Sequence, residues 1–334
     1  MNDNCHRICL TPARNEAWII RQFVAAAKSW ADHIIVADQG SSDGTLELLR
    51  AESAVDVVIN NSPSFDEVHR QRLLIDRARR IPGKRVLIAL DADEALSANA
   101  AQSAEWQRIM DAAPGTVLRF KWVNIMPGFQ HAWIPDQRKR CGFIDDGREH
   151  GGQRIHNQRV PGGHDAPVID LEEIVVLHFQ YVVWERMRRK HRWYQVWEHL
   201  EHKEKRPLDI VRQYSHMFGS WAEHEMRPLE KEWLFGYKTS NIDFTTLSCE
   251  PITWWDREVA RMLCEKGAAY FRKLPIWDQD WAAIASDLGL SHNNLRDPRS
   301  RLEKLAHRVL AATQGDRDTL WVRAFEKYLR LSGW

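Results

Sequence analysis

Three acidic side chains follow a short apolar run near the end of the first third of the chain. Residues 87–90 (LIAL) are apolar, and Asp91, Asp93 and Glu94 come directly after them. Four apolar residues in a row are typical of a strand buried on both faces of a parallel sheet. Open α/β sheets bind ligands at the carboxyl ends of such strands, and alternation along a strand predicts that Asp91 and Asp93 point the same way. Two carboxylates there suit a hard divalent cation, whose shell a nucleotide diphosphate would complete.

Strands and helices are predicted to alternate through the part of the chain that precedes these acids. Apolar runs typical of strands lie at 6–11, 33–38 and 55–60. Amphipathic helical patterns and short turn-forming loops separate them, which predicts a parallel sheet with right-handed crossovers. Polar residues then gather at one sheet edge, from segments 11–16, 38–43 and 91–94. This context favours the metal site over an alternative in which the acids form a turn that caps the next helix.

Three motifs in this region together resemble glycosyltransferase family 2, whose members have the GT-A fold. The motifs are 12–16 (PARNE), 36–45 (VADQGSSDGT) and 90–94 (LDADE). They stand in the family's order and spacing and cover roughly the first third of the chain. The resemblance implies a nucleotide-diphosphate sugar donor, foremost a UDP-sugar, and a divalent cation, Mn²⁺ or Mg²⁺. It also implies inverting transfer of the sugar to a hydroxyl of a glycan or glycolipid acceptor, as in the synthesis of bacterial envelope polysaccharide or lipopolysaccharide.

The resemblance assigns roles to individual residues at the three strand ends. Contacts with the nucleotide fall to Pro12, Arg14, Glu16 and Asp38. Asp91 is assigned to the ribose and the metal shell, and Asp93 to the metal itself. Such acids are chemically sensible, because a divalent ion that bridges two phosphates stabilises a departing diphosphate. For Asp38, a cap of the following loop is the alternative role.

Two further residues are candidate ligands for the donor or its cation. Arg72 lies on a predicted amphipathic helix, where its guanidinium could bind a phosphate or the donor sugar. A solvated basic helix face is the alternative. His178 follows an apolar run typical of a buried strand, and GT-A enzymes often supply a late histidine as a metal ligand. A histidine beside carboxylates favours Mn²⁺ over Mg²⁺, and a histidine packed in the core is the alternative.

A long polar region at about 126–167 is interpreted as the acceptor side of the site, since long loops of this kind are usually functional. Transfer needs a base that removes the acceptor's proton, and a carboxylate is the usual group. The candidates are Asp145, Asp146, Glu149 and Asp136. For each of them the alternative is a turn residue or the partner of a nearby arginine.

These observations predict an α/β fold of the GT-A (Rossmann-like) type, with a mostly parallel sheet flanked by helices and a helical C-terminal extension. A chain of 334 residues suits one catalytic domain with an appendage. We expect a nucleotide-sugar-binding and catalytic domain at 1–183. The region 184–334 is predicted to be mainly helical, and the sequence leaves open whether it serves the acceptor, an oligomer or a membrane surface.

Composition argues against several classes of protein. The net charge of +1 gives no general attraction to nucleic acid. No apolar run reaches membrane-spanning length, and the first residues do not resemble a signal peptide. Five cysteines without metal-binding spacing indicate a reducing compartment. We therefore expect a cytoplasmic protein, with peripheral contact to the inner face of a membrane left open.

The sequence also bears on functions other than glycosyl transfer. A sugar-1-phosphate nucleotidyltransferase on a related fold needs a glycine-rich phosphate loop after the first strand, and segment 12–16 has no glycine. A nicotinamide-dependent dehydrogenase is disfavoured in the same way, because the Gly-x-Gly-x-x-Gly motif is missing. A catalytically inactive protein that binds nucleotide sugars would carry the same three motifs and stays as the non-enzymatic alternative.

Overall fold

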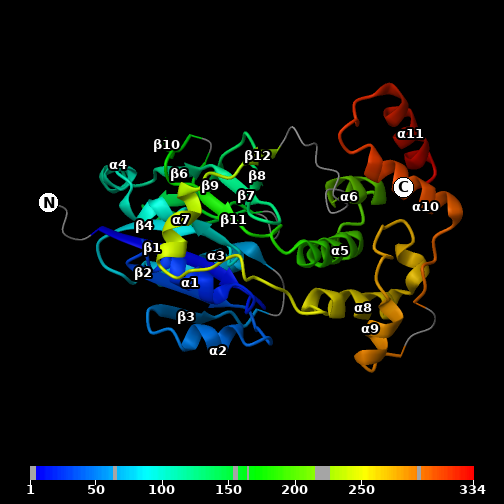
Figure 1. The fold of residues 1–334 in the computed structure, drawn as a ribbon, viewed down its shortest axis with the longest axis horizontal. Helices are drawn as coiled ribbons and strands as arrows, with labels where there is room; N and C mark the ends of the chain where they lie inside the picture. Colours follow the sequence, from blue (N-terminus) through cyan, green and yellow to red (C-terminus); the bar gives the residue numbers. More distant parts are fainter. Residues whose placement is uncertain (1–4, 63–65, 153–156, 164, 215–225, 292–294) are drawn as a thin grey trace. The chain divides into compact units, whose positions relative to one another are not determined.

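The computed structural model describes residues 5–62, 66–152, 157–163, 165–214, 226–291 and 295–334. The chain forms two compact units (Figure 1). The first comprises Met1–Val182 and Arg227–Ser248, and the second comprises Val183–Met226 and Cys249–Trp334. Residues 227–248 thus belong to the first unit, although the boundary expected at 183 assigns them to the C-terminal region. The reason is packing, because Trp233, Tyr237 and Phe244 are buried in a core of the first unit.

A seven-stranded sheet forms the centre of the first unit. Its strands, in spatial order, are β10 (Val168–Asp170), β6 (Val117–Phe120), β9 (Lys139–Ile144), β4 (Lys84–Ala89), β1 (Cys5–Ala13), β2 (His33–Asp38) and β3 (Val55–Ile59). Neighbouring strands are parallel, except that β9 is antiparallel to β4 and β6. The predicted α/β fold with a mostly parallel sheet is confirmed.

The central strands are apolar on both faces because helices cover both faces (Figure 1). On one face, Cys9, Val36 and Ile88 share a core with α1 (Ile20–Ala27), α2 (Thr45–Arg50) and α4 (Glu105–Asp111). On the other face, Leu10 and Leu87 share a core with α3 (Glu67–Ala78). This two-sided burial explains the continuous hydrophobic runs in the sequence.

A second sheet extends the first unit beyond the acidic residues at 91–94. Its strands, in spatial order, are β12 (Met226–Pro228), β8 (His131–Trp133), β7 (Trp122–Ile125), β11 (Val176–His178) and β5 (Glu94–Leu96). The short helix η1 (Ala98–Gln102) follows β5, and α7 (Glu232–Thr239) adds Trp233 and Tyr237 to the core beneath this sheet. The register places His178 opposite both Glu94 and Asn124, so three polar side chains share one row of this sheet.

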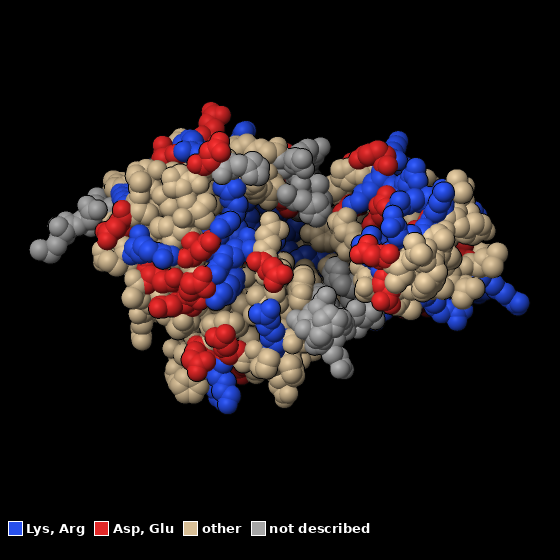
Figure 2. Space-filling model, turned by 90° about the horizontal axis from the view of Figure 1, so that it is seen from above, with Lys and Arg blue, Asp and Glu red and all other residues tan. Residues whose placement is uncertain are grey.

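The second unit is helical. Its helices are α5 (Trp184–Glu201), α6 (Pro207–Tyr214), α8 (Trp254–Lys266), η4 (Ala268–Phe271), α9 (Trp281–Asp287), α10 (Arg301–Ala312) and α11 (Leu320–Leu331). A core rich in aromatic side chains, including Trp193, Trp255 and Trp281, holds them together. On the face drawn in Figure 2, Lys and Arg lie interspersed with Asp and Glu on both units. In the described part of the chain, no helix combines the length and apolar character needed to cross a bilayer.

Candidate functional site

The carboxyl ends of β4, β1 and β2 lie next to one another at one edge of the central sheet. Leu10 of β1 pairs with Ala89 of β4, and Ala13 pairs with Asp38 of β2. This adjacency was predicted from the alternation of strands and helices. It brings the three sequence motifs to one place, which is where parallel sheets bind their ligands.

Hydrogen bonds connect the loop after β1 to the loop after β2. The Asn15 N–H donates to Ser41 Oγ at 2.9 Å, and Asn15 Oδ1 accepts from the Ser42 N–H at 2.7 Å. The Glu16 N–H donates to Thr45 Oγ1 at 2.8 Å. Asn15 has a φ of 56°, a conformation that asparagine tolerates better than most residues. The two loops therefore form one ordered unit.

Three of the residues predicted to contact the nucleotide belong to the first of these loops or to the strand before it. Pro12 lies within β1, opposite Ala37 of β2. Arg14 and Glu16 are half-buried in the loop that follows. The Glu16 carboxylate accepts a hydrogen bond from Trp18 Nε1 at 2.6 Å, which fixes its orientation.

Asp38 is buried at the end of β2, and its two carboxylate oxygens have different surroundings. Oδ2 accepts hydrogen bonds from the Gly40 and Ser41 N–H groups, each at 3.1 Å. Gly40 has a φ of 67°, which a residue without Cβ adopts at no steric cost. Oδ1 is also buried, and no described residue gives it a hydrogen bond. Asp38 therefore caps its loop, as the alternative role held, and also presents an acceptor whose burial without a partner costs about 1–3 kcal/mol.

The acids after β4 do not belong to that strand. β4 ends at Ala89, and Asp91 and Asp93 lie in the turn that leads to β5. The expectation that strand alternation makes them point the same way is therefore wrong, since a turn does not alternate side chains. Asp91 pairs with Arg159, with Nη2 to Oδ2 at 2.6 Å, and 35% of its side chain is exposed. Asp93 is buried, and its Oδ2 lies 3.8 Å from Nε2 of His178.

The orientation of His178 follows from its neighbours. Asn124 Nδ2 donates to the Trp133 carbonyl at 3.2 Å, which identifies Oδ1 as the atom that faces His178 Nδ1 at 2.7 Å. Nδ1 must therefore carry the proton, and in the neutral imidazole Nε2 presents its lone pair toward Asp93. The ring is also stacked on Trp122, with centroids 4.5 Å apart. Proteins orient metal-binding histidines by such a hydrogen bond to the other ring nitrogen.

The Asp93–His178 pair suits a divalent cation, whereas the three-residue ligand set expected from the sequence is not assembled. Ligand atoms lie about 2.0–2.2 Å from such ions, so a separation of 3.8 Å allows both side chains to bind one ion. Asp91 is held by Arg159 instead. Within the described ranges, no group of three or more His, Cys, Asp or Glu side chains is placed to hold a metal. Phosphate oxygens and water would complete the shell of an ion held by this pair.

Arg159 and Glu94 also belong to the site, although neither was predicted to. Arg159 Nη1 bonds to the buried Glu94 carboxylate, and Nη2 bonds to both Asp91 and Glu94. Burial lowers the pKa of Arg159, but the charges of Asp91 and Glu94 outweigh it and raise that pKa well above its ordinary value. Glu94 also accepts from Trp122 Nε1 at 2.8 Å. A permanent cation thus offsets part of the negative charge of Asp91 and Glu94.

Asp145 and Asp146 do not lie at this edge, which corrects their assignment to the acceptor side. They follow β9, which runs antiparallel to β4 with Ile144 opposite Val86. They therefore lie at the amino end of β4, about 20 Å of strand away from Asp91. Asp146 pairs with Arg148 at 2.5 Å, as the alternative interpretation held.

The Asp145 carboxylate is an internal anchor. Its side chain is fully buried and pairs with Arg79 and Arg85, each at 2.9 Å. Burial raises its pKa, but hydrogen bonds from Arg79, the Gly147 N–H and Arg85 outweigh burial, and the pKa lies below its ordinary value. Such a group is a poor proton acceptor.

The described residues of 145–152 and 157–159, which we name the return segment, run beside α3 from one sheet edge to the other. Arg79, just past the end of α3, holds Asp145. Arg72, in the middle of α3, donates to the His150 carbonyl at 2.6 Å. Glu67, at the start of α3, accepts from the Asn157 N–H at 2.7 Å. The exposed Arg72 therefore anchors this segment rather than a phosphate, which corrects the donor contact expected for it.

The last two candidates for the base lie in different surroundings. Glu149 is exposed on the return segment, beside a cavity of about 440 Å³ lined by residues of 149–152 and 157–162. Asp136 is exposed between β8 and β9. β9 begins at Lys139, whose Nζ lies 4.0 Å from the centre of the Trp122 ring, the same ring that stacks on His178. Of the four candidates, Asp136 is thus the one that the fold places at the edge with Asp93.

Comparison with known proteins gives weak likenesses. No family model and no curated protein match the chain. Among solved structures, GalNAc-T7 with UDP, GalNAc and Mn²⁺ is 11% identical over 80% of this chain and 58% of its own, with a TM-score of 0.33. HddC from Yersinia pseudotuberculosis is 8% identical over 52% and 93%, with a TM-score of 0.29. A nucleotidyl transferase from Methanothermobacter is 17% identical over 34% and 62%, with a TM-score of 0.23. At this level of similarity, the fold class rests on the strand order, and any function rests on the site.

Proposed function

We propose that this protein is a divalent-metal-dependent glycosyltransferase that moves a sugar from a nucleotide-diphosphate donor to an acceptor hydroxyl. The observation that carries the proposal is the buried pair Asp93 and His178, with Oδ2 and Nε2 3.8 Å apart. This pair lies beside Asp91, at the sheet edge where Asp38 ends β2. A cation-binding pair next to an ordered polar loop unit suits a ligand with a diphosphate at one end and a base at the other.

The diphosphate end of the donor would meet Asp93, His178 and Arg159. A bound divalent cation would withdraw charge from the departing diphosphate as a Lewis acid. One carboxylate and one imidazole would hold it, a donor set that favours Mn²⁺ over Mg²⁺. Arg159 forks onto Asp91 and Glu94, and a guanidinium of this geometry binds phosphate oxygens equally well. Asp91, once parted from Arg159, would reach the ribose or the metal shell.

The nucleoside end of the donor would meet the joined loops after β1 and β2. The unbonded Oδ1 of Asp38 is an acceptor for an imide or amino N–H of the base. Arg14 and Glu16 lie on the neighbouring loop, with the strand end at Pro12 behind them. A ligand that donates a hydrogen bond to Asp38 Oδ1 would remove the free-energy cost of burying this oxygen without a partner. Ligand binding would therefore also stabilise the loop that Asp38 caps.

The acceptor's proton would pass to Asp136. An exposed carboxylate at the correct sheet edge can accept a proton as the hydroxyl attacks, and one such base is enough for an inverting reaction. Further detail rests on the resemblance of segments 12–16, 36–45 and 90–94 to glycosyltransferase family 2. It gives a UDP-sugar as donor and a cytoplasmic enzyme that acts on a glycan or glycolipid of the cell envelope.

The test is metal-dependent binding and slow hydrolysis of a UDP-sugar. We expect UDP to bind with Mn²⁺ and not with EDTA, and a trace of sugar to be released from the UDP-sugar in water. Asp93→Asn should abolish both, while Asp76→Asn, which changes an exposed carboxylate on α3, should leave both intact. Hydrolysis that persists in EDTA would refute the metal-dependent mechanism.

Two other outcomes identify the alternatives. UDP binding without any hydrolysis, over a panel of donor sugars, would indicate a catalytically inactive binding protein. Release of pyrophosphate from a nucleoside triphosphate and a sugar 1-phosphate would indicate a nucleotidyltransferase.

A further inference from the structure

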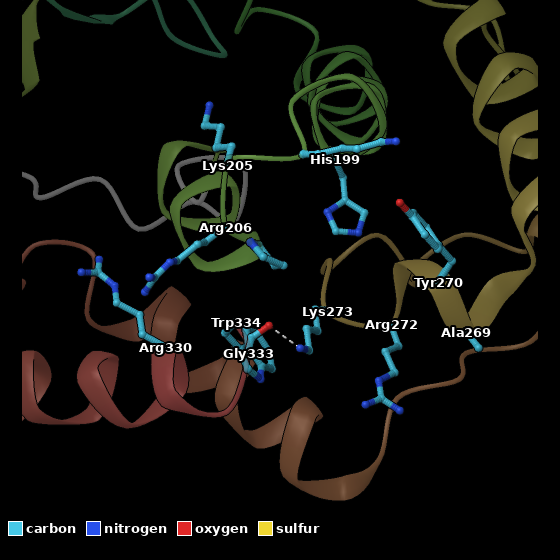
Figure 3. A pocket seen from close by; sticks show the side chains of 12 residues that line it. His199, Lys205, Arg206, Ala269, Tyr270, Arg272, Lys273, Arg330, Gly333 and Trp334 are labelled. Atoms are coloured by element: carbon cyan, nitrogen blue, oxygen red, sulfur yellow. Dashed lines mark hydrogen bonds between the residues drawn. The ribbon is translucent and has the colours of Figure 1, made fainter.

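The second unit contains a cavity of about 610 Å³, and the charged side chains that line it are all basic (Figure 3). Its cationic residues are Lys203, Lys205, Arg206, Arg272, Lys273 and Arg330. His199, Tyr270 and Trp334 also contribute to the wall, and no acidic side chain does. The volume falls in the range of small-molecule sites, about 300–1,000 Å³. It therefore has room for more than a single inorganic ion.

The six cations do not contribute equally. Lys205 pairs with Glu198, and Arg272 pairs with Glu303 at 3.1 Å. In Figure 3 these two side chains point away from the space, whereas Arg206 and Arg330 point toward one another. Arg330 also pairs with Asp209 at 3.2 Å and with Glu326 at 3.7 Å, two acids outside the lining that offset part of its charge.

Arg206 and Lys203 have no ion pair with any described residue, so the pocket keeps an excess of positive charge. Lys273 donates to the Gly333 carbonyl, a neutral acceptor, as the dashed line in Figure 3 marks. An anion placed between Arg206 and Arg330 would relieve the repulsion between two guanidinium groups.

The backbone adds to this positive potential. α6 begins at Pro207, and the Arg206 carbonyl accepts from the Asp209 and Ile210 N–H groups of its first turn. The amino end of the helix is therefore next to the pocket, with Arg206 and Pro207 in the lining. Helix amino ends favour anions, and phosphate above all. Asp209, in that first turn, offsets part of the effect and is itself held by Arg330.

The pKa values of two side chains in the cavity wall, Lys273 and His199, lie below their ordinary values. Burial, and then the charge of Arg272, lower the pKa of Lys273, although Glu303 opposes them. Burial also lowers the pKa of His199, so its imidazole is neutral near pH 7 and can donate or accept one hydrogen bond. The His199 ring lies 5.2 Å from that of Tyr270, which is 46% exposed. The two rings are tilted by 59° to each other, so the half-exposed Tyr270 ring alone offers a flat face for the body of a ligand.

We propose that this pocket binds a phosphate or diphosphate group carried by a sugar-sized ligand. Arg206 and Arg330 would bind the phosphate oxygens, Lys273 would complete the cationic wall, and Tyr270 would contact the body of the ligand. This site is a second one, made wholly from the helical unit, and it does not depend on the glycosyltransferase proposal. Arginine forks match phosphate geometry better than lysine does, which agrees with two arginines at its centre.

The test is calorimetric titration of the full chain with pyrophosphate and with glucose 1-phosphate, in EDTA and at constant ionic strength. We expect saturable binding to the wild-type protein and at least about tenfold weaker binding to Arg206→Gln, since the variant loses a charged hydrogen bond to the phosphate. Arg257→Gln removes an exposed arginine from α8 of the same unit and should bind as the wild type does. Asp93→Asn should also bind normally, because its defect lies in the metal site.

Three outcomes would overturn the proposal. These are no saturable binding to the wild type, equal weakening in Arg206→Gln and Arg257→Gln, or loss of binding in Asp93→Asn with Arg206→Gln unaffected.

Vesicles of phosphatidylcholine with phosphatidic acid then separate the two sources of the phosphate group. Sedimentation with these vesicles that Arg206→Gln reduces and pyrophosphate competes away would indicate a lipid headgroup. Binding in solution without sedimentation would indicate a free phosphorylated ligand.

Discussion

Nδ1 of His178 lies 2.7 Å from Oδ1 of Asn124, and the second amide group of Asn124 is fixed by the Trp133 carbonyl. The amide therefore determines which nitrogen of His178 faces Asp93. In the proposed metal site, Asn124 would orient His178 without binding the cation itself, so we assign it a positioning role.

Removal of this hydrogen bond should weaken metal binding. We expect Asn124→Ala to reduce the affinity for Mn²⁺ in the presence of UDP by about 10–100-fold, the usual cost of losing an outer-shell partner of a metal ligand. Titration of Mn²⁺ against UDP binding measures the effect. Gln130→Ala changes an exposed amide in the same unit and serves as the control. Equal titrations for Asn124→Ala and the wild type would remove Asn124 from this role.

Loss of Arg159 should destabilise the first unit. Arg159→Met leaves the buried Glu94 without its cation, and breaking a buried pair costs about 3–5 kcal/mol. Arg138→Met, which breaks a pair with the largely exposed Glu172, should cost less than about 1 kcal/mol. Urea unfolding at pH 7 compares the two variants. Mn²⁺ should restore more stability to Arg159→Met than to the wild type, because the ion would replace the missing charge. Equal stabilities for the two variants would contradict the buried pairing.

Replacement of Asp38 by asparagine should separate its two roles. The asparagine carbonyl oxygen can still accept from Gly40 and Ser41, but its amide places two donors where Oδ1 now offers an acceptor. We expect the thermal unfolding temperature to change little and UDP to bind about tenfold more weakly. Thermal unfolding and UDP titration of the same preparation provide both measurements. A stable variant with unchanged UDP affinity would leave Asp38 a loop cap alone.

Two carboxylates should respond in opposite ways to neutralisation. Asp136→Asn should lower the turnover of donor by at least about 100-fold with little change in stability, because a base contributes about 10²–10⁴-fold. Asp145→Asn should leave turnover per folded molecule unchanged but destabilise the protein by about 3 kcal/mol, the cost of breaking a buried pair. If instead Asp145→Asn lost turnover and Asp136→Asn kept it, Asp145 would be the base, at the opposite edge of the sheet.

The pH dependence of the Asp145 contribution has a definite sign. The pKa of Asp145 is lower in the folded protein than its ordinary value of 3.8, so the folded state binds this proton less readily than the unfolded chain does. Its contribution is therefore fully present above pH 3.8 and is lost as the pH falls through the lowered folded value. The difference in unfolding free energy between Asp145→Asn and the wild type should shrink in the same range. A constant difference down to pH 2 would contradict the depressed pKa.

The sequence predicted the fold better than it predicted the site. Buried strands such as β4 are readable because apolar runs and turn residues are local, and their parallel order brings Asp38 and Asp91 to one edge. His178 was expected as a metal ligand from the family resemblance, but no local pattern shows how it is held next to Asp93. That depends on the register of β11 with β5 and β7, which sets His178 opposite Glu94 and Asn124. Arg159 was missed because the return segment approaches the acids from a distant part of the chain.

The antiparallel direction of β9 explains why Asp145 and Asp146 were predicted at the wrong edge of the sheet. A polar loop rich in acids looks the same in the sequence whichever edge it occupies. Strand direction alone decides the edge, and one antiparallel strand carries Asp145 to the side opposite Asp93 and His178.

The hydrogen bonds of Asn15 with Ser41 and Ser42 order the loops after β1 and β2 without any ligand. The nucleoside that we propose to bind there would lose little binding energy to ordering of the backbone, so a small set of contacts can suffice for recognition. Substitutions that remove this cross-link should then weaken nucleotide binding before they destabilise the sheet.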